Sequence, residues 1–277
     1  WSKILIKNFK NYNHRLLFSS SKYIDKKNNY KDFKKIPIRN LDFLILASST
    51  SRNLDAFKYF IKKKIPLFVE KPIANNYKNY LVIKKVIKSN LAFVHYQHIY
   101  SDPIIYLKKQ FAKEKLISIK IDFGKNGPYK DINSSYEWLP HPLSILFYLF
   151  NYELKLPTKY SNYINKKKTN IIINGNISKE IYLTIKSGNN FKKKKYFIKI
   201  MTDKKIYTYN ATNPKELIVD HYIFNKKKVI KFKSFPLDSS IKVFSSILKD
   251  KKKKRLVIRQ NKNITNKIMK YLYKTNL

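Results

Sequence analysis

The chain has 277 residues and no cysteine, which is enough length for one or two domains and excludes disulfides and thiolate metal sites. No apolar run approaches the roughly 20 residues that cross a bilayer, and the first residues carry no signal-peptide pattern, so we expect a cytoplasmic protein without a membrane partner. Sixty Lys and Arg residues against 17 Asp and Glu residues give a formal net charge of +43.

This charge has two interpretations. A polyanion partner such as nucleic acid would select for it, but Lys, Asn, Ile, Tyr and Phe are all abundant while Gly is reduced to four. This bias in amino-acid composition affects apolar and polar positions alike. It therefore favours compositional drift of the sequence over selection for a specific nucleic-acid function. We expect the lysine runs in solvated loops. These runs are Lys62–Lys64, Lys166–Lys168, Lys192–Lys195, Lys226–Lys228 and Lys251–Lys254.

The first third of the chain alternates helix and strand. Apolar spacing predicts helices over 1–12, 53–63 (with Asn53 as the N-cap) and 77–88, and short strands over 15–19, 42–47, 67–69 and 91–96. This alternation is typical of an α/β domain with a doubly wound parallel sheet. We assign this domain to residues 1–97.

The pattern changes after about residue 115. Alternating segments predict strands over 116–123, 170–175, 179–186, 196–201, 205–210, 217–224 and 229–233, with helices over 142–150, 239–249 and 264–273. We therefore expect an α+β domain over residues 98–277, with a large, mostly antiparallel sheet and a C-terminal helix able to pack back on the first domain. Ligands usually bind in clefts between such domains.

One strand runs directly into a candidate catalytic motif. Residues 67–69 are followed by Glu70, Lys71 and Pro72, and ligands of open parallel sheets lie beyond the carboxyl ends of the strands. A lysine there is placed to act on a ligand, although an isolated lysine means little in so basic a chain. A cis bond between Lys71 and Pro72 would fix the direction of the lysine.

The arrangement resembles the glucose–fructose oxidoreductase / inositol dehydrogenase (Gfo/Idh/MocA) family, in which a strand ends in a small-residue turn and the next strand ends in Glu-Lys-Pro. Here the turn is Ala47-Ser48-Ser49, Asn53 lies where a His is common, and Glu70 follows it by 17 residues. A second match lies in the segment 136–150, where Glu137 and His141 open a helix of the second domain. The stretch 127–131 resembles the segment that precedes it in nucleotide-sugar members.

The start of the chain resembles the helix that follows the family's glycine-rich turn. Ser2 then occupies the third glycine position, while the first strand and the first two glycines are absent. We therefore expect this to be an N-terminally truncated chain that binds a dinucleotide poorly, because those glycines permit the tight turn and the close approach to the pyrophosphate.

The resemblance implies a Rossmann-type domain and an NAD(P)-dependent enzyme that transfers hydride between nicotinamide and a secondary alcohol or ketone of a sugar, nucleotide sugar or cyclitol. His141 then acts as general acid or base, Lys71 binds the same oxygen, and Glu137 orients the site. Candidates for the substrate pocket are Tyr96, Tyr129 and Trp138. Candidates for cofactor contact are Ser2, Ser20, Lys22, Ser48, Ser49, Asn53, Glu70 and Lys71, and no metal is expected.

The cofactor preference rests on the end of the strand over 15–19. No acid follows it before Asp25, whereas an acid at that point binds the ribose of NAD. Ser20 and Lys22 could hold a 2′-phosphate, which favours NADP slightly over NAD. The family resemblance also implies a homo-dimer or homo-tetramer. Two alternatives stay open: a non-catalytic member of the same fold and a basic polyanion-binding protein.

Overall fold

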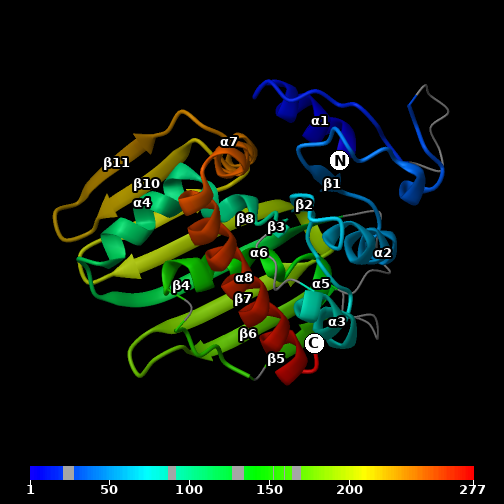
Figure 1. Ribbon diagram of the computed structural model, residues 1–277. Helices are drawn as coiled ribbons and strands as arrows, with labels where there is room; N and C mark the ends of the chain where they lie inside the picture. Colours follow the sequence, from blue (N-terminus) through cyan, green and yellow to red (C-terminus); the bar gives the residue numbers. More distant parts are fainter. Residues whose placement is uncertain (21–27, 87–91, 127–133, 152, 159, 164–169) are drawn as a thin grey trace. The chain divides into compact units, whose positions relative to one another are not determined.

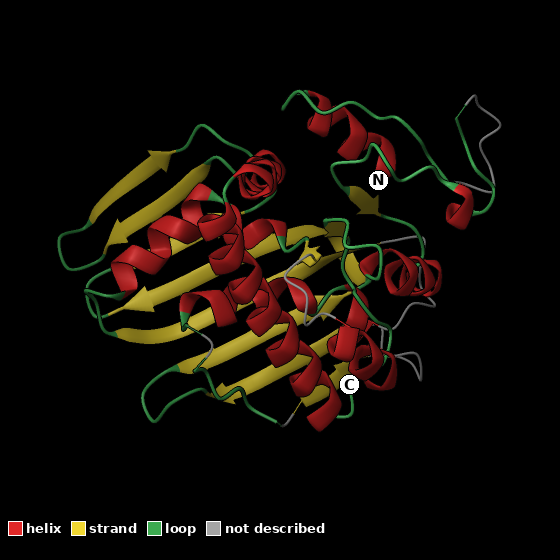
Figure 2. Cartoon of the chain, in the orientation of Figure 1, coloured by secondary structure: helices red, strands yellow, loops and turns green. Residues whose placement is uncertain are grey.

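The computed structural model describes all residues except 21–27, 87–91, 127–133, 152, 159 and 164–169. The chain forms two compact units: Trp1–His95 with Ile241–Lys262, called unit 1 below, and Tyr96–Ser240 with Asn263–Leu277, called unit 2. Figure 1 labels the elements and Figure 2 separates helices from strands. None of the described helices is both long and apolar enough to cross a membrane.

Unit 1 is the α/β part of the fold. Its elements are α1 (Ser2–Lys10), the 3-10 helix η1 (Phe33–Lys35), β1 (Leu44–Leu46), α2 (Thr50–Ile61), β2 (Leu67–Val69), α3 (Tyr77–Val86) and β3 (Ala92–Val94). The three strands pair in parallel in the order β1-β2-β3. The parallel sheet that the sequence predicts is therefore confirmed.

Phenylalanines fill the core of unit 1. The Phe68 ring of β2 lies 5.2 Å from the ring of Phe9 on α1, 5.5 Å from Phe93 on β3 and 5.2 Å from Phe244. All four side chains are at most 3% exposed. Burying a large aromatic side chain contributes about 1.5–3 kcal/mol, so this cluster is a main source of the stability of the small sheet.

Two predictions in unit 1 are wrong. Residues 15–19 do not form a strand: Ser19 alone pairs, in an isolated parallel bridge with Asn29, because a strand needs a neighbour along its length and this segment has one only at that point. Asn53 does not cap a helix, since α2 begins at Thr50 with Ser49 as its N-cap. The Asn53 side chain instead bonds back to the turn before the helix.

Unit 2 is built on a large sheet. The elements from residue 96 onward are η2 (Gln97–Tyr100), α4 (Asp102–Phe111), β4 (Leu116–Asn126), α5 (Ser134–Glu137), α6 (Pro140–Leu149), β5 (Tyr160–Tyr163), β6 (Asn170–Asn176), β7 (Tyr182–Gly188), β8 (Asn190–Thr202), β9 (Ile206–Asn210), β10 (Glu216–His221), β11 (Lys226–Lys231), α7 (Pro236–Lys249) and α8 (Lys251–Lys274). Residues of α7 and α8 fall in both units.

The strand order of this eight-stranded sheet is β11-β10-β9-β8-β4-β7-β6-β5. Among the strands that the structure describes in this sheet, only β4 and β7 pair in parallel, so the prediction of a mostly antiparallel sheet is confirmed. Alternate residues of β4 (Ile119, Ile121 and Phe123) are fully buried, as the period of two in a strand requires. Helix α6 packs on β4 and is apolar on nearly every side.

The prediction that the lysine runs lie in loops is mostly wrong. Lys192–Lys195 belong to β8, Lys226–Lys228 to β11 and Lys251–Lys254 to the first turn of α8. Lysines are tolerated there because their long stems reach water from a strand or helix. Lys62–Lys64 do follow a helix, while Lys166–Lys168 lie outside the described residues.

Candidate functional site

The Glu70-Lys71-Pro72 motif begins where β2 ends, at the carboxyl edge of the parallel sheet. The Lys71–Pro72 peptide bond is cis, as the sequence suggested. Hydrogen bonds from Glu70 N to Leu46 O and from His95 N to Val69 O, both 2.8 Å, continue the ladder past the last strand residues. Backbone hydrogen bonds to the neighbouring chain segments on both sides thus fix the start of the motif.

Glu70 and His95 form a buried pair at this edge. Glu70 Oε1 lies 2.6 Å from His95 Nδ1, and the residues are only 8% and 2% exposed. Burial by itself raises the pKa of the Glu70 carboxyl, but the charge and hydrogen bond of His95, a hydrogen bond with Trp1 and the charge of Lys71 together hold that pKa below its usual value. The Glu70 carboxylate, proposed from the sequence as a cofactor contact, therefore already has an internal partner.

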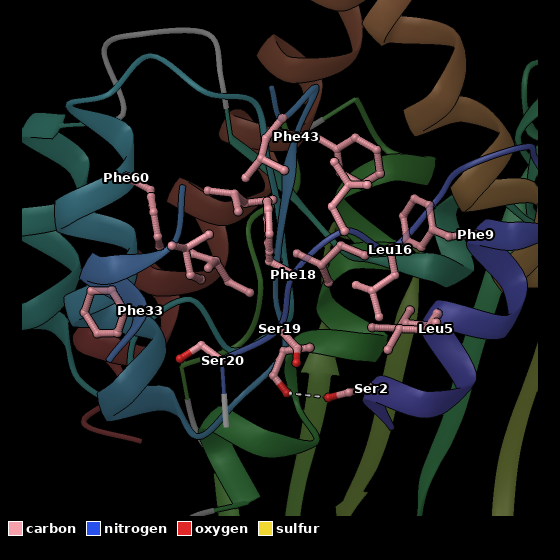
Figure 3. Close-up of a pocket in the computed structure, with 18 of the residues that line it drawn as sticks. Ser2, Leu5, Phe9, Leu16, Phe18, Ser19, Ser20, Phe33, Phe43 and Phe60 are labelled. Atoms are coloured by element: carbon pink, nitrogen blue, oxygen red, sulfur yellow. Dashed lines mark hydrogen bonds between the residues drawn. The ribbon is translucent and has the colours of Figure 1, made fainter. Parts of the chain in front are cut away.

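Four predicted cofactor residues line one cavity of unit 1: Ser2, Ser20, Ser48 and Asn53. Ser2 Oγ donates to the carbonyl of Ala47 (3.3 Å), the first residue of the turn, and Figure 3 shows this bond with Ser20 nearby. Asn53 orders the same turn: its Oδ1 accepts from the Ser48 hydroxyl at 2.7 Å and its Nδ2 donates to the Ser48 carbonyl at 3.0 Å. Polar groups thus gather at the carboxyl end of β1.

Arg52 joins this group and was missed by the sequence analysis. It lies in the first turn of α2, and its Nη2 donates to Ser20 Oγ at 3.0 Å. A guanidinium beside a hydroxyl is well suited to bind a phosphate. The sequence signal was a cation just after the Ser48–Ser49 turn. Lys22, the cation that the sequence analysis chose for this task, lies outside the described residues.

Ser49 lies at the start of α2 as its N-cap, exposed and without a side-chain cap hydrogen bond. Helix N-termini present backbone N–H groups and a positive dipole end, which favours anions. The cavity therefore combines the hydroxyls of Ser2, Ser20 and Ser48 with the Arg52 guanidinium and the start of α2, and these groups fit the phosphates of a dinucleotide.

In unit 2, the predicted residues His141 and Trp138 lie together. Their ring centroids are 6.2 Å apart. Trp138 is 5% exposed, and its indole N–H donates to Asn189 Oδ1. Glu137 ends α5 immediately before Trp138, so the three predicted residues come from the short junction between α5 and α6.

Two further rings contact the ring of His141, and a third stacks on one of them; none of the three was predicted. The ring of His98 on η2 lies 5.4 Å from that of His141, and the ring of Phe123 on β4 lies 5.9 Å from it. Tyr196 on β8 stacks on Phe123 at 5.0 Å with an interplanar angle of 10°. Burial raises the pKa of the Tyr196 hydroxyl, and the charge of Glu137 raises it further. The pairing of Phe123 with Tyr196 is a β4–β8 register, which no local pattern reveals.

Of the two tyrosines proposed for the substrate pocket, the structure describes only Tyr96. Tyr96 is 3% exposed, and its hydroxyl donates to Thr265 Oγ1 at 3.1 Å, which gives it a packing role in unit 2. Tyr129 lies outside the described residues. Lys71 belongs to unit 1 and His141 to unit 2, so their joint action stays a prediction.

No protein-family model and no curated protein sequence matches the chain. Solved structures do match in fold. A UDP-N-acetylglucosamine 3-dehydrogenase from Acidithiobacillus ferrooxidans is 10% identical, with a TM-score of 0.73 over 98% of this chain and 95% of that one. An inositol dehydrogenase homolog from Azotobacter vinelandii, in complex with NADH and myo-inositol, is 8% identical, with a TM-score of 0.66 over 85% of this chain and 74% of that one.

A third match is a Gfo/Idh/MocA family oxidoreductase from Vibrio cholerae, which is 11% identical and has a TM-score of 0.66 over 88% of this chain and 81% of that one. At such low identity the likeness shows the fold alone. It agrees with the small parallel sheet of unit 1 and the large, mostly antiparallel sheet of unit 2. The chain therefore has the fold of the Gfo/Idh/MocA family of oxidoreductases.

Proposed function

We propose that the protein is an NAD(P)-dependent oxidoreductase acting on a secondary alcohol or ketone of a sugar, nucleotide sugar or cyclitol. The observation that carries the proposal is the Glu70-Lys71-Pro72 motif at the carboxyl end of β2, within a fold shared with dehydrogenases. One of those proteins is a UDP-N-acetylglucosamine 3-dehydrogenase, and another holds NADH and myo-inositol. Both support a polyhydroxylated substrate.

The cofactor contacts follow from the polar end of the cavity. Ser2, Ser48 and Ser49 would hold the pyrophosphate, with the N-terminus of α2 adding its N–H groups. Ser20 and Arg52 would bind a phosphate on the adenosine ribose, which favours NADP, with NAD as the alternative. When bound, the nicotinamide cofactor accepts or supplies the hydride.

We assign transfer of the substrate's hydroxyl proton to His141 of unit 2. Nδ1 of His141 is buried, so we assign Nε2 to the substrate: it takes the hydroxyl proton when the alcohol is oxidised and returns it to the oxygen in reduction. The ammonium group of Lys71 hydrogen-bonds the same oxygen and stabilises its developing negative charge. Trp138 and Tyr196 would offer flat faces to the sugar ring, and Glu137 would orient its hydroxyl groups.

A fluorescence titration with NADH and NADPH tests this proposal. Because the first two glycines of the turn are absent, we expect both to bind weakly but measurably, with NADPH tighter. We expect Lys71→Ala to weaken binding further, while the exposed control Lys62→Ala does not. Absence of binding by either dinucleotide would overturn the proposal. Steeply salt-dependent nucleic-acid binding in its place would favour the polyanion-binding alternative.

A turnover assay on the same preparation separates an enzyme from a non-catalytic member of the fold. Sugars, nucleotide sugars and cyclitols are supplied as substrate classes, and nicotinamide absorbance is followed. If Lys71 and His141 act on one oxygen, the kcat losses of Lys71→Ala and His141→Asn will not add in the double variant. Additive losses would remove the shared site.

A further inference from the structure

A hairpin with an exposed apolar tip lies at one edge of the large sheet of unit 2. Strand β11 is the last strand of that sheet and pairs with β10, as Figure 1 shows. The loop that joins them begins with three large side chains, called the hairpin tip below: Tyr222 is 39% exposed, Ile223 59% and Phe224 69%. Adjacent exposed apolar side chains rimmed by polar residues indicate an interaction surface, whereas single ones do not.

The loop is an ordered turn. Phe224 N donates to His221 O at 2.9 Å, which closes it, and Asn225 has a φ of 48°, in the left-handed region that asparagine tolerates. The Tyr222 hydroxyl donates to the carbonyl of Thr202 at 3.0 Å and so ties the loop to the end of β8. The apolar side chains are therefore exposed by a defined backbone.

Three exposed lysines follow the tip on β11. These residues, Lys226–Lys228, are called the lysine rim below. Because side chains alternate along a strand, Lys226 and Lys228 lie on one face of the hairpin and Lys227 on the other. Asp220 is the cross-strand neighbour of Lys227, but none of the three lysines forms an ion pair with a carboxylate in the part of the chain that the structure describes.

The spacing of tip and rim matches the depth of a membrane interface. A strand rises about 3.3 Å per residue, which places the rim roughly 7–13 Å along the chain from Phe224. Segments that lie on a membrane bury their apolar side chains about 5–10 Å into the boundary between headgroups and acyl chains. The long lysine stems let the ammonium groups reach the lipid phosphates while the tip lies deeper.

A second copy of this chain is a poor occupant of the surface. A symmetric contact would place the same patch on both copies and bring the two lysine rims together, where like charges repel. A non-symmetric contact needs an acidic patch, yet the chain has 17 Asp and Glu residues against 60 Lys and Arg residues. The few side chains of the tip also fall far short of the roughly 800 Å² that each partner of a stable interface buries.

A nucleic acid fits the tip less well than a lipid surface does. Its phosphates would attract the rim, and its bases could stack on the rings of Tyr222 and Phe224. It offers no apolar layer for the aliphatic side chain of Ile223, however. An anionic lipid surface supplies both the negative charge and the apolar layer.

We propose that the hairpin tip and the lysine rim form a docking surface for a membrane that contains anionic phospholipid. Ile223 and Phe224 enter the acyl boundary, and the rim contacts the phosphates. The expectation of no membrane partner rested on the lack of a spanning segment, which a surface contact does not need. The proposal is independent of the enzymatic function proposed above.

Sedimentation of the full chain with vesicles tests the apolar part. Phosphatidylcholine vesicles are used with and without added phosphatidylserine, and we expect binding to those that contain phosphatidylserine. Phe224→Ser should weaken this binding about tenfold or more, since the apolar surface of the ring is no longer buried. The control is Leu256→Ser in α8, where the side chain is 63% exposed, and it should bind as the wild type does. Equal binding by the two variants would overturn the proposal.

The charged part needs a control for the general attraction of so basic a chain to anionic vesicles. Replacing Lys226–Lys228 together by glutamine should weaken binding about a hundredfold, because each lysine near an anionic surface strengthens it about fivefold. The matched control replaces the exposed Lys251–Lys253 of α8 by glutamine and removes the same charge. We expect a loss of a few-fold at most. Equal losses would show diffuse attraction and overturn the proposal.

Insertion is read from fluorescence. The indole introduced by Phe224→Trp should shift its emission to shorter wavelength on binding vesicles, after subtraction of the wild-type signal, and the indole introduced by Leu256→Trp should not. An unshifted emission from the tip would overturn the proposal. Vesicle binding that survives Phe224→Ser would also overturn it: loss of single-stranded RNA binding in that variant would then assign the tip to nucleic acid, and dissociation of an oligomer would assign it to a second copy. Thermal unfolding verifies that each variant is folded.

Discussion

The Glu70 carboxylate and the His95 imidazole meet 2.6 Å apart at the ends of two neighbouring parallel strands. Val69 pairs with Val94 in the β2–β3 register, so the residues that follow them are brought side by side. Both residues are almost fully buried, and Glu70 directly precedes Lys71 in the chain. It therefore fixes the backbone from which the proposed catalytic lysine extends.

Glu70→Gln is expected to destabilise the protein by about 2–3 kcal/mol, because it removes the charge from a buried carboxylate whose hydrogen bond with His95 contributes about 1.5–3 kcal/mol. Urea denaturation at pH 7 measures this loss. The control is Glu180→Gln, which breaks the exposed Lys115–Glu180 pair and should change stability little. Equal effects of the two substitutions would contradict the structural role of Glu70.

The same pair predicts a pH dependence. The folded-state pKa of Glu70 lies below its ordinary value of 4.5, so its contribution to stability is complete above about pH 4.5 and is lost as pH falls through the lower folded-state value. Wild-type stability measured from pH 7 to pH 3 should fall more steeply in acid than that of Glu70→Gln. Parallel curves for the two proteins would rule this out.

Arg52→Ala should weaken NADPH binding about tenfold or more and leave NADH binding nearly unchanged, because a hydrogen bond to a charged group contributes about 1.5–3 kcal/mol. Ser20→Ala removes the hydroxyl that accepts from Arg52 and should act in the same direction, more weakly. Dissociation constants for both dinucleotides provide the measurement. Equal losses for NADH and NADPH would show that Arg52 does not read a 2′-phosphate.

His141→Asn should lower kcat by about 10²–10⁴ fold, the usual contribution of a general acid or base, with dinucleotide affinity retained. The matched control is His221→Asn in β10, which should keep full activity. A pH profile of kcat is measured for each protein. Full activity of His141→Asn would assign proton transfer to another group.

Asn189→Ala removes the acceptor for the indole N–H of Trp138, and a buried donor left without an acceptor costs about 1–3 kcal/mol. We expect lower thermal stability, and a KM increase that exceeds the change in kcat, because Trp138 is proposed to position substrate. Asn189→Asp keeps an acceptor and should restore part of both. A loss of stability with KM unchanged would limit Asn189 to packing.

Several features could be predicted because they are local. The apolar triplet Leu67–Val69 followed by Glu-Lys-Pro indicates a buried strand with a motif at its end, and the spacing of Leu54, Phe57 and Ile61 predicts the buried face of α2. Glu137, Trp138 and His141 lie within one turn region, so sequence spacing alone brings them near one another. Each depends on interactions between residues only a few positions apart.

The sequence by itself thus determined many of the strand and helix segments, the class of fold and the motif residues, since hydrophobic periodicity and turn chemistry act over short distances. It missed the helix Asp102–Phe111 and the first half of the helix Lys251–Lys274. Tertiary structure alone decided that His95 meets Glu70, that Tyr196 stacks on Phe123, and that Asn261 covers β3 from 167 residues away. It also decided that residues 15–19 do not form a regular strand. The physical reason is that strand pairing and side-chain contact depend on which segments become neighbours in space, and hydrophobic patterning specifies which face is buried but not which partner covers it.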